Sequence, residues 1–467
     1  MIGWVSVMEG PRATRRAVPD RRPVPRRPGP VPHRWVGDVA VAAAGLGLGA
    51  VIAMAVTAET AGSLHSPGGW TIFAGRMAAL VGSYLLLLSV LLVGRIPAVE
   101  AAVGQERLVR WHRWLGPWPL VLLSVHAVTI TVGYAQLART GAWHQFGVFL
   151  SQYPDVLAST VALGLLLAAG VTSVRAARRR MRYETWWAVH LYTYLAMALA
   201  FSHQLANGMS FIVHPLVRVL WGVLWASTAG VVLLFRVGLP IGRTLRHRLK
   251  VVEVREEAPG VVSIVCAGRA VDRLAVSGGQ FFQWRFLTRG LWWHAHPYSL
   301  SALPHPPHLR VTVKEAGDQS SALRSLRPGT RVVIEGPYGS FTPHLRHGPK
   351  VLLVAAGVGV TPIRALLEDL PAGVKPTVVL RASSRQDLVL RDEVAELVAR
   401  RGGTLHELVG PRSKVKLDAR ALKRLVPDIR SRDLYICGPE GFTKRLVTAA
   451  RALSVPEDRI HHEAFAF

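Results

Sequence analysis

Six long apolar segments fill the first half of the chain, and short polar stretches separate them. An α-helix of about 20 apolar residues crosses the hydrocarbon core of a bilayer, which is roughly 30 Å thick. The segments that reach this length are residues 35–57, 70–94, 112–136, 155–174, 185–206 and 212–235. The pattern predicts a six-helix transmembrane bundle, hence a multi-pass protein of the cell membrane whose first partner is the lipid bilayer.

The apolar runs become short beyond about residue 240. Strand-like runs punctuated by Gly and Pro predict an antiparallel β-barrel. From about residue 349, strands alternate with helical segments, which is the pattern of an α/β nucleotide-binding domain. The predicted domains are a disordered basic tail at 1–34, a membrane domain at 35–236, a β-barrel domain at 237–346 and an α/β domain at 347–467.

The chain is half hydrophobic, yet its formal net charge is +27. This combination is typical of a membrane protein with basic cytoplasmic loops. Lys and Arg gather in the N-terminal tail and in loops 95–111, 175–184 and 236–250, whereas loops 58–69 and 207–211 contain neither. The positive-inside rule therefore predicts two cytoplasmic termini. The Arg clusters flank apolar segments and form no recognisable nucleic-acid-binding module, so no nucleic acid partner is expected.

Four histidines form two pairs within the apolar segments. His112 and His126 lie in the third segment, and His190 and His203 lie in the fifth. Each pair spans roughly 20 Å along a helix at about 1.5 Å per residue. With both segments running outward, His112 and His190 lie near the cytoplasmic face, and His126 and His203 lie deeper. Such pairs can bind two haems, one above the other, although four unrelated helix histidines are the alternative.

Helical phase places a condition on these pairs. At about 100° per residue, the fourteen residues from His112 to His126 return to within roughly 40° of the same face. The thirteen residues from His190 to His203 leave the second side chain about 140° away. We therefore predict a tightened turn or bulge between His190 and His203.

A sequence motif in the β-rich region resembles a flavin-binding signature. The run 279–282 precedes His296, Pro297, Tyr298 and Ser299, which have the His-Pro-aromatic-Ser form of the ferredoxin–NADP reductase superfamily found in ferric reductases and NADPH oxidases. The resemblance implies that Tyr298 packs on the FAD isoalloxazine and that Ser299 hydrogen-bonds it. An ordinary strand with a buried tyrosine is the alternative.

A group of small and polar residues follows at a predicted helix start. Free backbone N–H groups at such a start suit a phosphate, and in the similar families this position holds the FAD pyrophosphate. A plain capped helix is the alternative. The candidate residues are Gly317, Gln319, Ser320 and Ser321.

Two further motifs point to a nicotinamide nucleotide. A glycine-rich turn follows the apolar strand 351–355 and opens a helix, where glycines permit close approach to a pyrophosphate and a proline suits the first turn. A Cys-Gly-Pro triplet ends a later strand, and the resemblance implies that it borders the nicotinamide, with the cysteine in the hydride-transfer site. The candidate residues are Gly357, Gly359, Thr361, Pro362, Cys437, Gly438 and Pro439.

The loop after the next strand indicates which nucleotide is preferred. A site for NADH usually offers an acidic residue to the ribose. Here Ser383 and Arg385 lie in a run with two hydroxyls and two guanidiniums, and the nearest acid is Asp387. Arg and Ser suit a 2′-phosphate, so NADPH is favoured over NADH, with a solvated loop as the alternative.

One candidate lies at the C-terminal end of the chain. The resemblance implies that a C-terminal aromatic, Phe467 before Phe465, covers the flavin, with Glu463 near the flavin edge; a frayed tail is the alternative.

Arg76 lies inside the second apolar segment. An intramembrane arginine indicates function by default, and a propionate of the outer haem is its expected partner, with snorkelling as the alternative.

From about residue 35 the whole chain resembles the ferric reductase and NADPH oxidase superfamily. The resemblance implies that NAD(P)H reduces FAD, which passes electrons through two haem b groups to an outer acceptor. FAD is needed because a nicotinamide gives two electrons and a haem takes one. Ferric chelates are the first candidate acceptor and oxygen is the second. A quinone-linked or non-catalytic haem membrane protein is an alternative of another class. The sequence does not indicate which protein partners, if any, the chain has.

Overall fold

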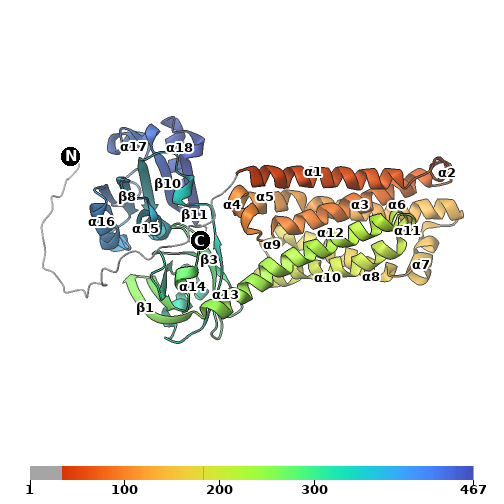
Figure 1. Ribbon diagram of the computed structural model, residues 1–467, viewed down its shortest axis with the longest axis horizontal. Helices are drawn as coiled ribbons and strands as arrows, with labels where there is room; N and C mark the ends of the chain where they lie inside the picture. The colour runs from red at the N-terminus through yellow and green to blue at the C-terminus, as the bar shows by residue number, and fades with distance from the viewer. Residues whose placement is uncertain (1–33, 182, 466–467) are drawn as a thin grey trace.

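The computed structural model describes residues 34–181 and 183–465 and has two parts (Figure 1). A long helical bundle occupies one end, and a module of strands and helices occupies the other. The long helices are α1 (Arg34–Thr57), α3 (Gly69–Leu92), α6 (Pro117–Ala138), α8 (Val156–Ser173), α10 (Tyr183–Asn207) and α12 (Pro215–Leu233). Helix α5 (Gln105–Leu115) has 11 residues and leads through Gly116 into α6. The short helices are α2 (Ala61–His65), α4 (Pro97–Val103), α7 (Ala142–Gln152), α9 (Arg175–Arg178) and α11 (Met209–Val213).

Among the described residues, five helices are long and apolar enough to cross a membrane. They are Trp35–Thr57, Gly69–Leu92, Arg107–Ala138, Val156–Ser173 and Pro215–His247. Helix α10, which contains the predicted span 185–206, has 25 residues but is not one of the five, because polar residues interrupt its apolar sequence. It packs along α8. Five of the six predicted spans therefore fall on helices that are long and apolar enough to cross a membrane, and the predicted six-helix bundle is not confirmed.

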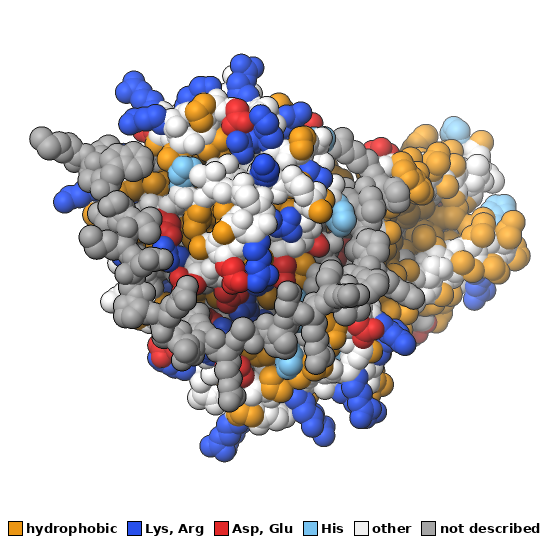
Figure 2. All heavy atoms as spheres, turned by 60° about the vertical axis from the view of Figure 1, so that its left-hand side comes forward, with side chains coloured by type: hydrophobic (Ala, Val, Ile, Leu, Met, Phe, Trp, Pro, Cys, Tyr) orange, Lys and Arg blue, Asp and Glu red, His pale blue; other side chains and the backbone are white. Residues whose placement is uncertain are grey.

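The outer surface of the bundle is apolar. Large hydrophobic side chains such as Leu46, Val128 and Leu216 are exposed, and orange side chains dominate this part of Figure 2 while basic side chains gather on the module. Inside, Tyr84, Leu87 and other aliphatic and aromatic residues form the core. An apolar exterior over an apolar core is the arrangement expected for helices surrounded by lipid.

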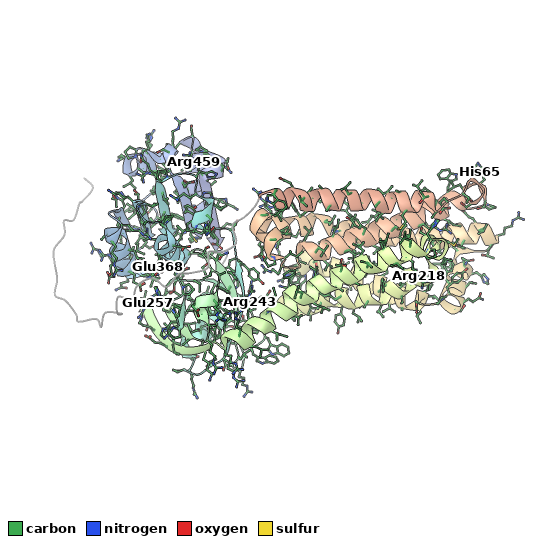
Figure 3. All side chains as sticks on the ribbon, viewed as in Figure 1. His65, Arg218, Arg243, Glu257, Glu368 and Arg459 are labelled. Carbon is green, nitrogen blue, oxygen red and sulfur yellow. The ribbon has the colours of Figure 1, made fainter. Side chains whose placement is uncertain are left out.

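A continuous helical connection joins the bundle to the module. Helix α12 passes through a π-helical turn, η1 (Leu234–Gly238), into α13 (Leu239–His247). The predicted domain boundary at residues 236–237 thus falls within a helix rather than a loop. Figure 3 shows Arg243 on α13 where this helix reaches the module.

The β domain contains two small antiparallel sheets. One has the order β1 (Lys250–Ala258), β2 (Val261–Ala267) and β5 (His308–Lys314); the other has the order β4 (His296–Ser299), β3 (Phe281–Phe286) and β6 (Val332–Tyr338). Isolated bridges join Lys250 to Arg331 and Leu300 to Val311. The predicted closed barrel is therefore not confirmed, because single bridges rather than continuous ladders connect the sheet edges. The two sheets enclose one core that includes Trp284 and Phe282.

The α/β domain is a five-stranded parallel sheet, as the alternating pattern predicted. Its strand order is β11 (Ile460–Phe465), β10 (Asp433–Pro439), β7 (Val351–Ala356), β8 (Pro376–Ala382) and β9 (Thr404–Val409). The main helices are α15 (Val360–Asp369), α16 (Arg391–Arg400), α17 (Ala419–Leu425) and α18 (Glu440–Ala452). Because the strands are parallel, their carboxyl ends share one edge, where nucleotides bind in such folds.

Candidate functional site

The two histidines predicted nearer the cytoplasm face each other across the bundle. His112 lies on α5 and His190 on α10, and their ring centroids are 6.2 Å apart with the planes at 78°. Two imidazoles that bind one metal ion from opposite sides, through bonds of about 2 Å, place their ring centres roughly 6 Å apart. The pair therefore fits the axial positions of a haem iron. In Figure 1, α5 lies at the end of the bundle that faces the module.

The Nδ1 atoms of the α5 and α6 histidines are anchored to helix α3. His112 Nδ1 is 2.9 Å from the carbonyl oxygen of Ser89, and His126 Nδ1 is 3.0 Å from that of Gly75. A carbonyl oxygen only accepts hydrogen bonds, so each Nδ1 must carry the proton. This leaves Nε2 of both rings with a free lone pair, as metal ligation requires.

The α10 histidines have different surroundings. His190 Nδ1 is buried and has no hydrogen-bond partner among the described residues. His203 Nδ1 lies 3.2 Å from the side-chain amide nitrogen of Asn207. The structure thus brings His112 close to His190, as the spacing predicted, while the pairing of His126 with His203 stays a prediction.

The predicted irregularity between the α10 histidines is absent. Helix α10 is continuous from Tyr183 to Asn207, so the prediction of a distorted turn between His190 and His203 is wrong. The α-helix assignment is instead interrupted at Gly116, between α5 and α6 and thus between His112 and His126, although Gly116 keeps helical backbone angles (φ −52°, ψ −37°). Pro117 begins α6 at this point, and proline has no N–H for the helix ladder.

Glycines bring α3 and α6 close enough for the histidine anchors to form. A Cβ added at Gly75 would lie 2.6 Å from Thr129 Oγ1, and one at Gly133 would lie 2.6 Å from Ile72 Cγ1. Small residues at such contacts are how membrane helices approach each other closely. Gly75 therefore both permits the packing and supplies the carbonyl that orients His126.

Arg76 has a protein partner within the bundle. Its guanidinium donates to Glu59 Oε1 at 2.8 Å and to the Tyr134 hydroxyl at 3.4 Å, and the Glu59 side chain is 5% exposed. A buried carboxylate requires such a partner. The predicted contact with a haem propionate stays a prediction, and the ion pair accounts for the position of Arg76 without it.

The flavin motif forms β4 at the edge of its sheet. Tyr298 pairs with Phe282 of β3, and the indole N–H of Trp284 donates to the Tyr298 carbonyl at 3.0 Å. The rings of His296 and Tyr298 stack at 5.7 Å with their planes 20° apart. Burial raises the pKa of Tyr298 to about 12. The strand thus presents a neutral aromatic surface on which a planar ring system can lie.

Two polar atoms of this motif lack partners within the described chain. Ser299 Oγ and His296 Nε2 are buried without a hydrogen bond. Buried polar atoms are nearly always satisfied, so both atoms are suited to an external group. These atoms fit the hydrogen bonding expected from a bound isoalloxazine, with Pro297 between them on the strand.

The predicted pyrophosphate loop is preformed. Gly317 precedes α14 (Asp318–Ala322), and the Ser320 hydroxyl accepts from the Ala316 N–H at 2.8 Å while donating to the Gly317 carbonyl at 2.9 Å. Gln319 interacts with His296 of β4, which links this loop to the flavin motif. Ser320 therefore shapes the turn, while Gln319 and Ser321 stay candidates for ligand contact.

The two nicotinamide motifs meet at the carboxyl edge of the parallel sheet. A Cβ added at Gly359 would lie 2.3 Å from the carbonyl oxygen of Cys437, so only glycine allows this approach. Gly357 has φ +56° and leads directly from β7 into the turn before α15. Thr361 and Pro362 lie buried in the first turn of α15, as predicted. Motifs eighty residues apart thus form one site.

Cys437 is fully buried at the end of β10, where it pairs with Ala355 of β7 and with Glu463 of β11. Burial raises the pKa of its thiol, and the charge of Glu463 adds to the effect. The thiol is therefore protonated and uncharged. Gly438 and Pro439 complete β10, and Phe465 of β11 pairs with Pro439. Phe467, the other predicted aromatic cover, lies outside the described residues.

One buried, structural arginine lies near the end of β8, and one exposed arginine lies in the loop that follows the strand. Arg381 is buried and donates to the carbonyl of Gly410 at 2.8 Å, so only Arg385 remains exposed beside the exposed Ser383. The Asp387 carboxylate accepts from the N–H and hydroxyl of Ser384 at 3.0 and 2.8 Å. Because the acid is used locally, the loop offers cationic rather than acidic recognition.

An ion-pair network joins the membrane bundle to the β domain. Arg95 pairs with Glu100 at 2.9 Å and lies 4.2 Å over the ring of Tyr338, whose hydroxyl donates to Glu335 at 2.6 Å. Arg236 completes the network with a 3.1 Å bond to Glu335. A cavity of about 130 Å³ borders it on the bundle side. Sequence analysis missed this network, because its members are scattered between residues 95 and 338.

A second network joins the β domain to the α/β domain. Arg310 binds Glu393 through two bonds of 2.7 Å, and Arg364 bonds to both Glu393 and Glu368. Glu368, labelled in Figure 3, also accepts from His305 at 2.7 Å and from the Leu303 N–H at 2.8 Å. The network holds the flavin motif and the nucleotide edge in one arrangement.

The charge state of Glu368 predicts how this arrangement responds to pH. Burial by itself would raise the pKa of Glu368, but the bonds from His305, Arg364 and Leu303 outweigh it and hold the pKa at about 2. A depressed carboxyl pKa stabilises the folded state above its ordinary value of 4.5, and the contribution disappears as pH falls toward 2.

Glu368→Gln is therefore expected to destabilise the module by on the order of 2 kcal/mol at pH 7, with the difference from wild type shrinking between pH 4.5 and 2. Urea unfolding followed by protein fluorescence at several pH values measures it. Glu396→Gln on the exposed face of α16 is the control. A pH-independent difference would show that the ionised carboxylate is not the cause.

Comparisons with known proteins agree with the two halves of this site. Residues 74–201 match the family model described as "Ferric reductase like transmembrane component", and residues 353–448 match "Oxidoreductase NAD-binding domain". The chain joins a ferric-reductase-like membrane domain to an FAD/NAD-binding oxidoreductase module. This confirms the resemblance to the architecture of ferric reductases and NADPH oxidases.

Relatives with curated descriptions cover part of the chain. The ferredoxin reductase component of 3-ketosteroid-9-alpha-monooxygenase from Mycolicibacterium smegmatis is 32% identical over 229 residues, which are 46% of this chain and 65% of that protein. A flavohemoprotein from Vibrio cholerae is 31% identical over 180 residues, 36% of this chain and 45% of that protein. The chain thus spans less than two thirds of the length of these relatives.

Solved structures are similar over a comparable share. The flavohem-like FAD/NAD-binding domain of nitric oxide dioxygenase from Vibrio cholerae is 27% identical, covers 47% of this chain and 99% of that domain, and has a TM-score of 0.41. The Amycolatopsis cytochrome P450 reductase GcoB is 20% identical, with a TM-score of 0.40 and coverage of 47% of this chain.

Proposed function

We propose that the protein is a transmembrane oxidoreductase that passes electrons from cytoplasmic NADPH through FAD and two haem b groups to ferric iron chelates on the outer face. The observation that carries the proposal is the pair His112 and His190, 6.2 Å apart at the end of the bundle that faces the nucleotide-binding module. This pair links a membrane path to a reductant site in one chain.

The membrane histidines hold and orient the haems in this proposal. Bis-histidyl haem relays single electrons and has no open iron position for a substrate. His112 and His126 keep their ring orientations through the bonds to Ser89 and Gly75. The module would hold FAD, which supplies the conversion of a two-electron transfer from the nicotinamide into single-electron transfers. Tyr298 supports the flavin ring, and Ser299 meets its polar edge.

The nucleotide edge positions the reductant. Gly357 and Gly359 allow the backbone to approach the pyrophosphate. Cys437 places a small, protonated thiol beside the nicotinamide, so no thiolate competes with hydride movement. The Arg95–Tyr338 contact and the Arg236–Glu335 ion pair then keep the β domain against the bundle, which limits the separation between flavin and inner haem.

Anaerobic addition of NADPH to the purified, haem- and FAD-loaded protein tests the proposal. Reduction of the haem absorption bands is expected, and an absence of NAD(P)H-dependent haem reduction would contradict it and favour a quinone-linked or non-catalytic haem protein. The acceptor is tested with a ferric chelate, with and without superoxide dismutase. Reduction that resists the dismutase supports a ferric reductase, whereas abolished reduction identifies a superoxide-producing oxidase.

Arg385→Ala is expected to raise the KM for NADPH by roughly 10- to 100-fold while leaving that for NADH unchanged, because a charge-assisted hydrogen bond contributes about 1.5–3 kcal/mol. Steady-state kinetics with both nucleotides measure the change. Arg400→Ala is a matched control, since Arg400 is exposed on α16 and pairs with Glu396. Equal losses with both nucleotides would contradict a role in 2′-phosphate recognition.

Orientation follows the charge pattern of the loops. The basic loops lie at the ends of the helices nearest the module, and the nucleotide supply of a cell is cytoplasmic, so we place the module and both termini in the cytoplasm. Helices α2, α7 and α11 occupy the opposite end of the bundle (Figure 1). The acceptor then takes electrons at that end, near His126 and His203.

A further inference from the structure

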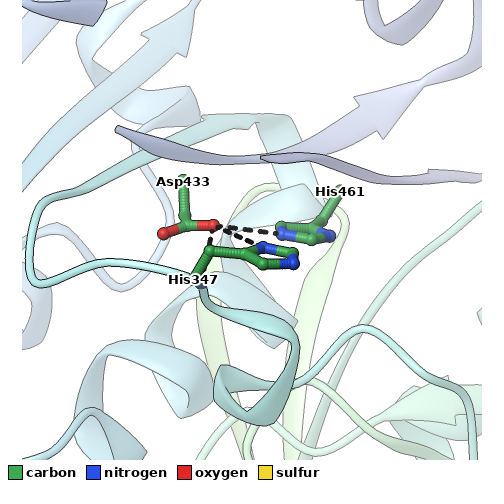
Figure 4. A group of neighbouring side chains, drawn as sticks. All are labelled: His347, Asp433 and His461. Atoms are coloured by element: carbon green, nitrogen blue, oxygen red, sulfur yellow. Dashed lines mark hydrogen bonds and ion pairs between the residues drawn. The ribbon is translucent and has the colours of Figure 1, made fainter. Parts of the chain in front are cut away.

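Three potential metal ligands meet at the edge of the parallel sheet opposite the nucleotide motifs. His347 precedes β7, Asp433 begins β10, and His461 is the second residue of β11. All three ligand atoms lie within 4.8 Å of one another. Figure 4 shows both imidazoles beside the carboxylate. The cluster is therefore built from the amino ends of three adjacent strands, with the nicotinamide motifs at their carboxyl ends.

The carboxylate is rigidly held. The Asp433 side chain has no exposed surface, and its oxygens accept from the N–H groups of His347 and Gly348 at 3.0 and 2.9 Å. These bonds come from the turn that carries His347, so they also fix the backbone of that ligand. A fully buried, ionised carboxylate is strongly destabilised unless a positive charge lies beside it.

His461 offers a buried nitrogen, Nε2, that lies 3.6 Å from Asp433 Oδ1, beyond the length of a good hydrogen bond. Its side chain is 8% exposed, and Nε2 makes no hydrogen bond. The ring packs 4.5 Å from that of Tyr435 and lies nearly parallel to that of His347. An unsatisfied buried nitrogen aimed at a carboxylate indicates a missing partner.

The separations fit metal ligation better than hydrogen bonding. Asp433 Oδ1 lies 3.4 Å from His347 Nδ1 and 3.6 Å from His461 Nε2. A good hydrogen bond is about 2.7–3.2 Å long, whereas ligands about 2.0–2.1 Å from a tetrahedral zinc ion stand roughly 3.3 Å apart. Both measured oxygen–nitrogen distances are closer to the separation of two zinc ligands than to the length of a good hydrogen bond. On the far side of His347, Asp458 Oδ2 lies 3.6 Å from Nε2. A carboxylate at this position beside the second ring nitrogen is typical of metal-binding histidines, whose rings it orients.

We propose that His347, Asp433 and His461 bind a divalent transition-metal ion of the zinc class. Two imidazoles and one carboxylate suit Zn²⁺, while Ca²⁺ and Mg²⁺ require mainly oxygen ligands. The half-exposed side of His347 leaves a fourth position for water. Such an ion ties together the amino ends of β7, β10 and β11, the strands that lead to Gly357, Cys437 and Phe465.

Zinc binding to the full-length, haem- and FAD-loaded protein in detergent tests this inference without reference to turnover. The protein is treated with a chelator, dialysed against Zn²⁺ and analysed for metal content, with affinity from calorimetry and thermal stability measured in parallel. The variants are His347→Gln and His461→Gln. His347 is partly exposed, so its replacement preserves folding even where that of His461 does not.

The matched control is His462→Gln, because His462 is the exposed neighbour of His461 on β11. Wild type and His462→Gln are expected to bind one more zinc ion than the two ligand variants, or to bind it at least about tenfold more tightly. Zinc should also raise the Tm of these two proteins alone. Equal zinc content and equal Tm shifts in all four proteins would overturn the proposal, whatever the electron-transfer assays show.

Discussion

His126→Ala is expected to lower the haem content from about two to about one per chain and to reduce acceptor reduction to the background rate. NADPH should still reduce the flavin and the inner haem, because His112 and His190 form a separate pair. The physical reason is that bis-histidyl haem requires both axial ligands, and the Gly75 carbonyl orients only His126. Haem extraction, absorption spectra and ferric-chelate reduction measure the three effects.

The matched control for this variant is His144→Ala on α7. His144 is an exposed histidine of the membrane domain without a facing partner in the predicted pairs, so both haems and full acceptor reduction should survive. His203→Ala should reproduce the effect of His126→Ala. Retention of two haems by both His126→Ala and His203→Ala would show that the ligand assignment is wrong.

Gly359→Ala is expected to lower the rate of flavin reduction by NADPH by at least about 100-fold, since misplacement of reacting groups by roughly 1 Å has effects of that size. The added methyl would lie 2.3 Å from the Cys437 carbonyl oxygen and 2.6 Å from its carbon. Both are backbone atoms of a central strand, so β10 must shift away from the turn that binds the nucleotide. Stopped-flow measurement of flavin absorbance gives the rate.

Gly441→Ala is the control for this steric effect. Gly441 lies in α18, and its added methyl would meet only the far end of the Arg445 side chain, at 3.6 Å. Dithionite should still reduce both haems in Gly359→Ala, because the membrane path is unchanged. A normal rate of flavin reduction in Gly359→Ala would mean that the two nicotinamide motifs do not form one site.

Sequence patterns located the chemical groups well where a local motif carries the chemistry. The glycine turn at 357–359 leads into a helix, as predicted, whereas the strand at 296–299 had appeared only in the alternative of an ordinary strand with a buried tyrosine. Local steric rules explain this success, because a proline, a glycine or an alternating apolar pattern restricts the same few residues in any context. The agreement concerns the local backbone of the motif and not its contacts with a cofactor.

Predictions that depended on continuous geometry were less successful. The distortion expected in α10 is absent, and the helix assignment is interrupted at Gly116 instead, because the phase calculation treated both helices as ideal and gave no weight to proline. The closed barrel is two sheets joined by single bridges. Strand length and twist decide whether edges pair fully, and neither can be read from a short alternating pattern.

The ion-pair networks between distant segments could not be predicted. Arg95 and Glu335 belong to one network at the bundle–module junction, and Glu368 joins its network through His305 and Arg364. In the sequence these are ordinary surface charges. Only the folded arrangement removes them from water, and partial burial is what makes such pairs matter for stability and position.

The sequence by itself determined the membrane character of the first half, the pairing of four histidines and the order of the flavin and nicotinamide motifs. These features follow from hydrophobicity, helical rise and local backbone restrictions, which act within a few turns or strands. The tertiary structure alone decided where the helix assignment is interrupted, how the domains are joined and that His347, Asp433 and His461 converge. Those outcomes depend on packing between segments far apart in the chain, whose relative placement no local rule contains.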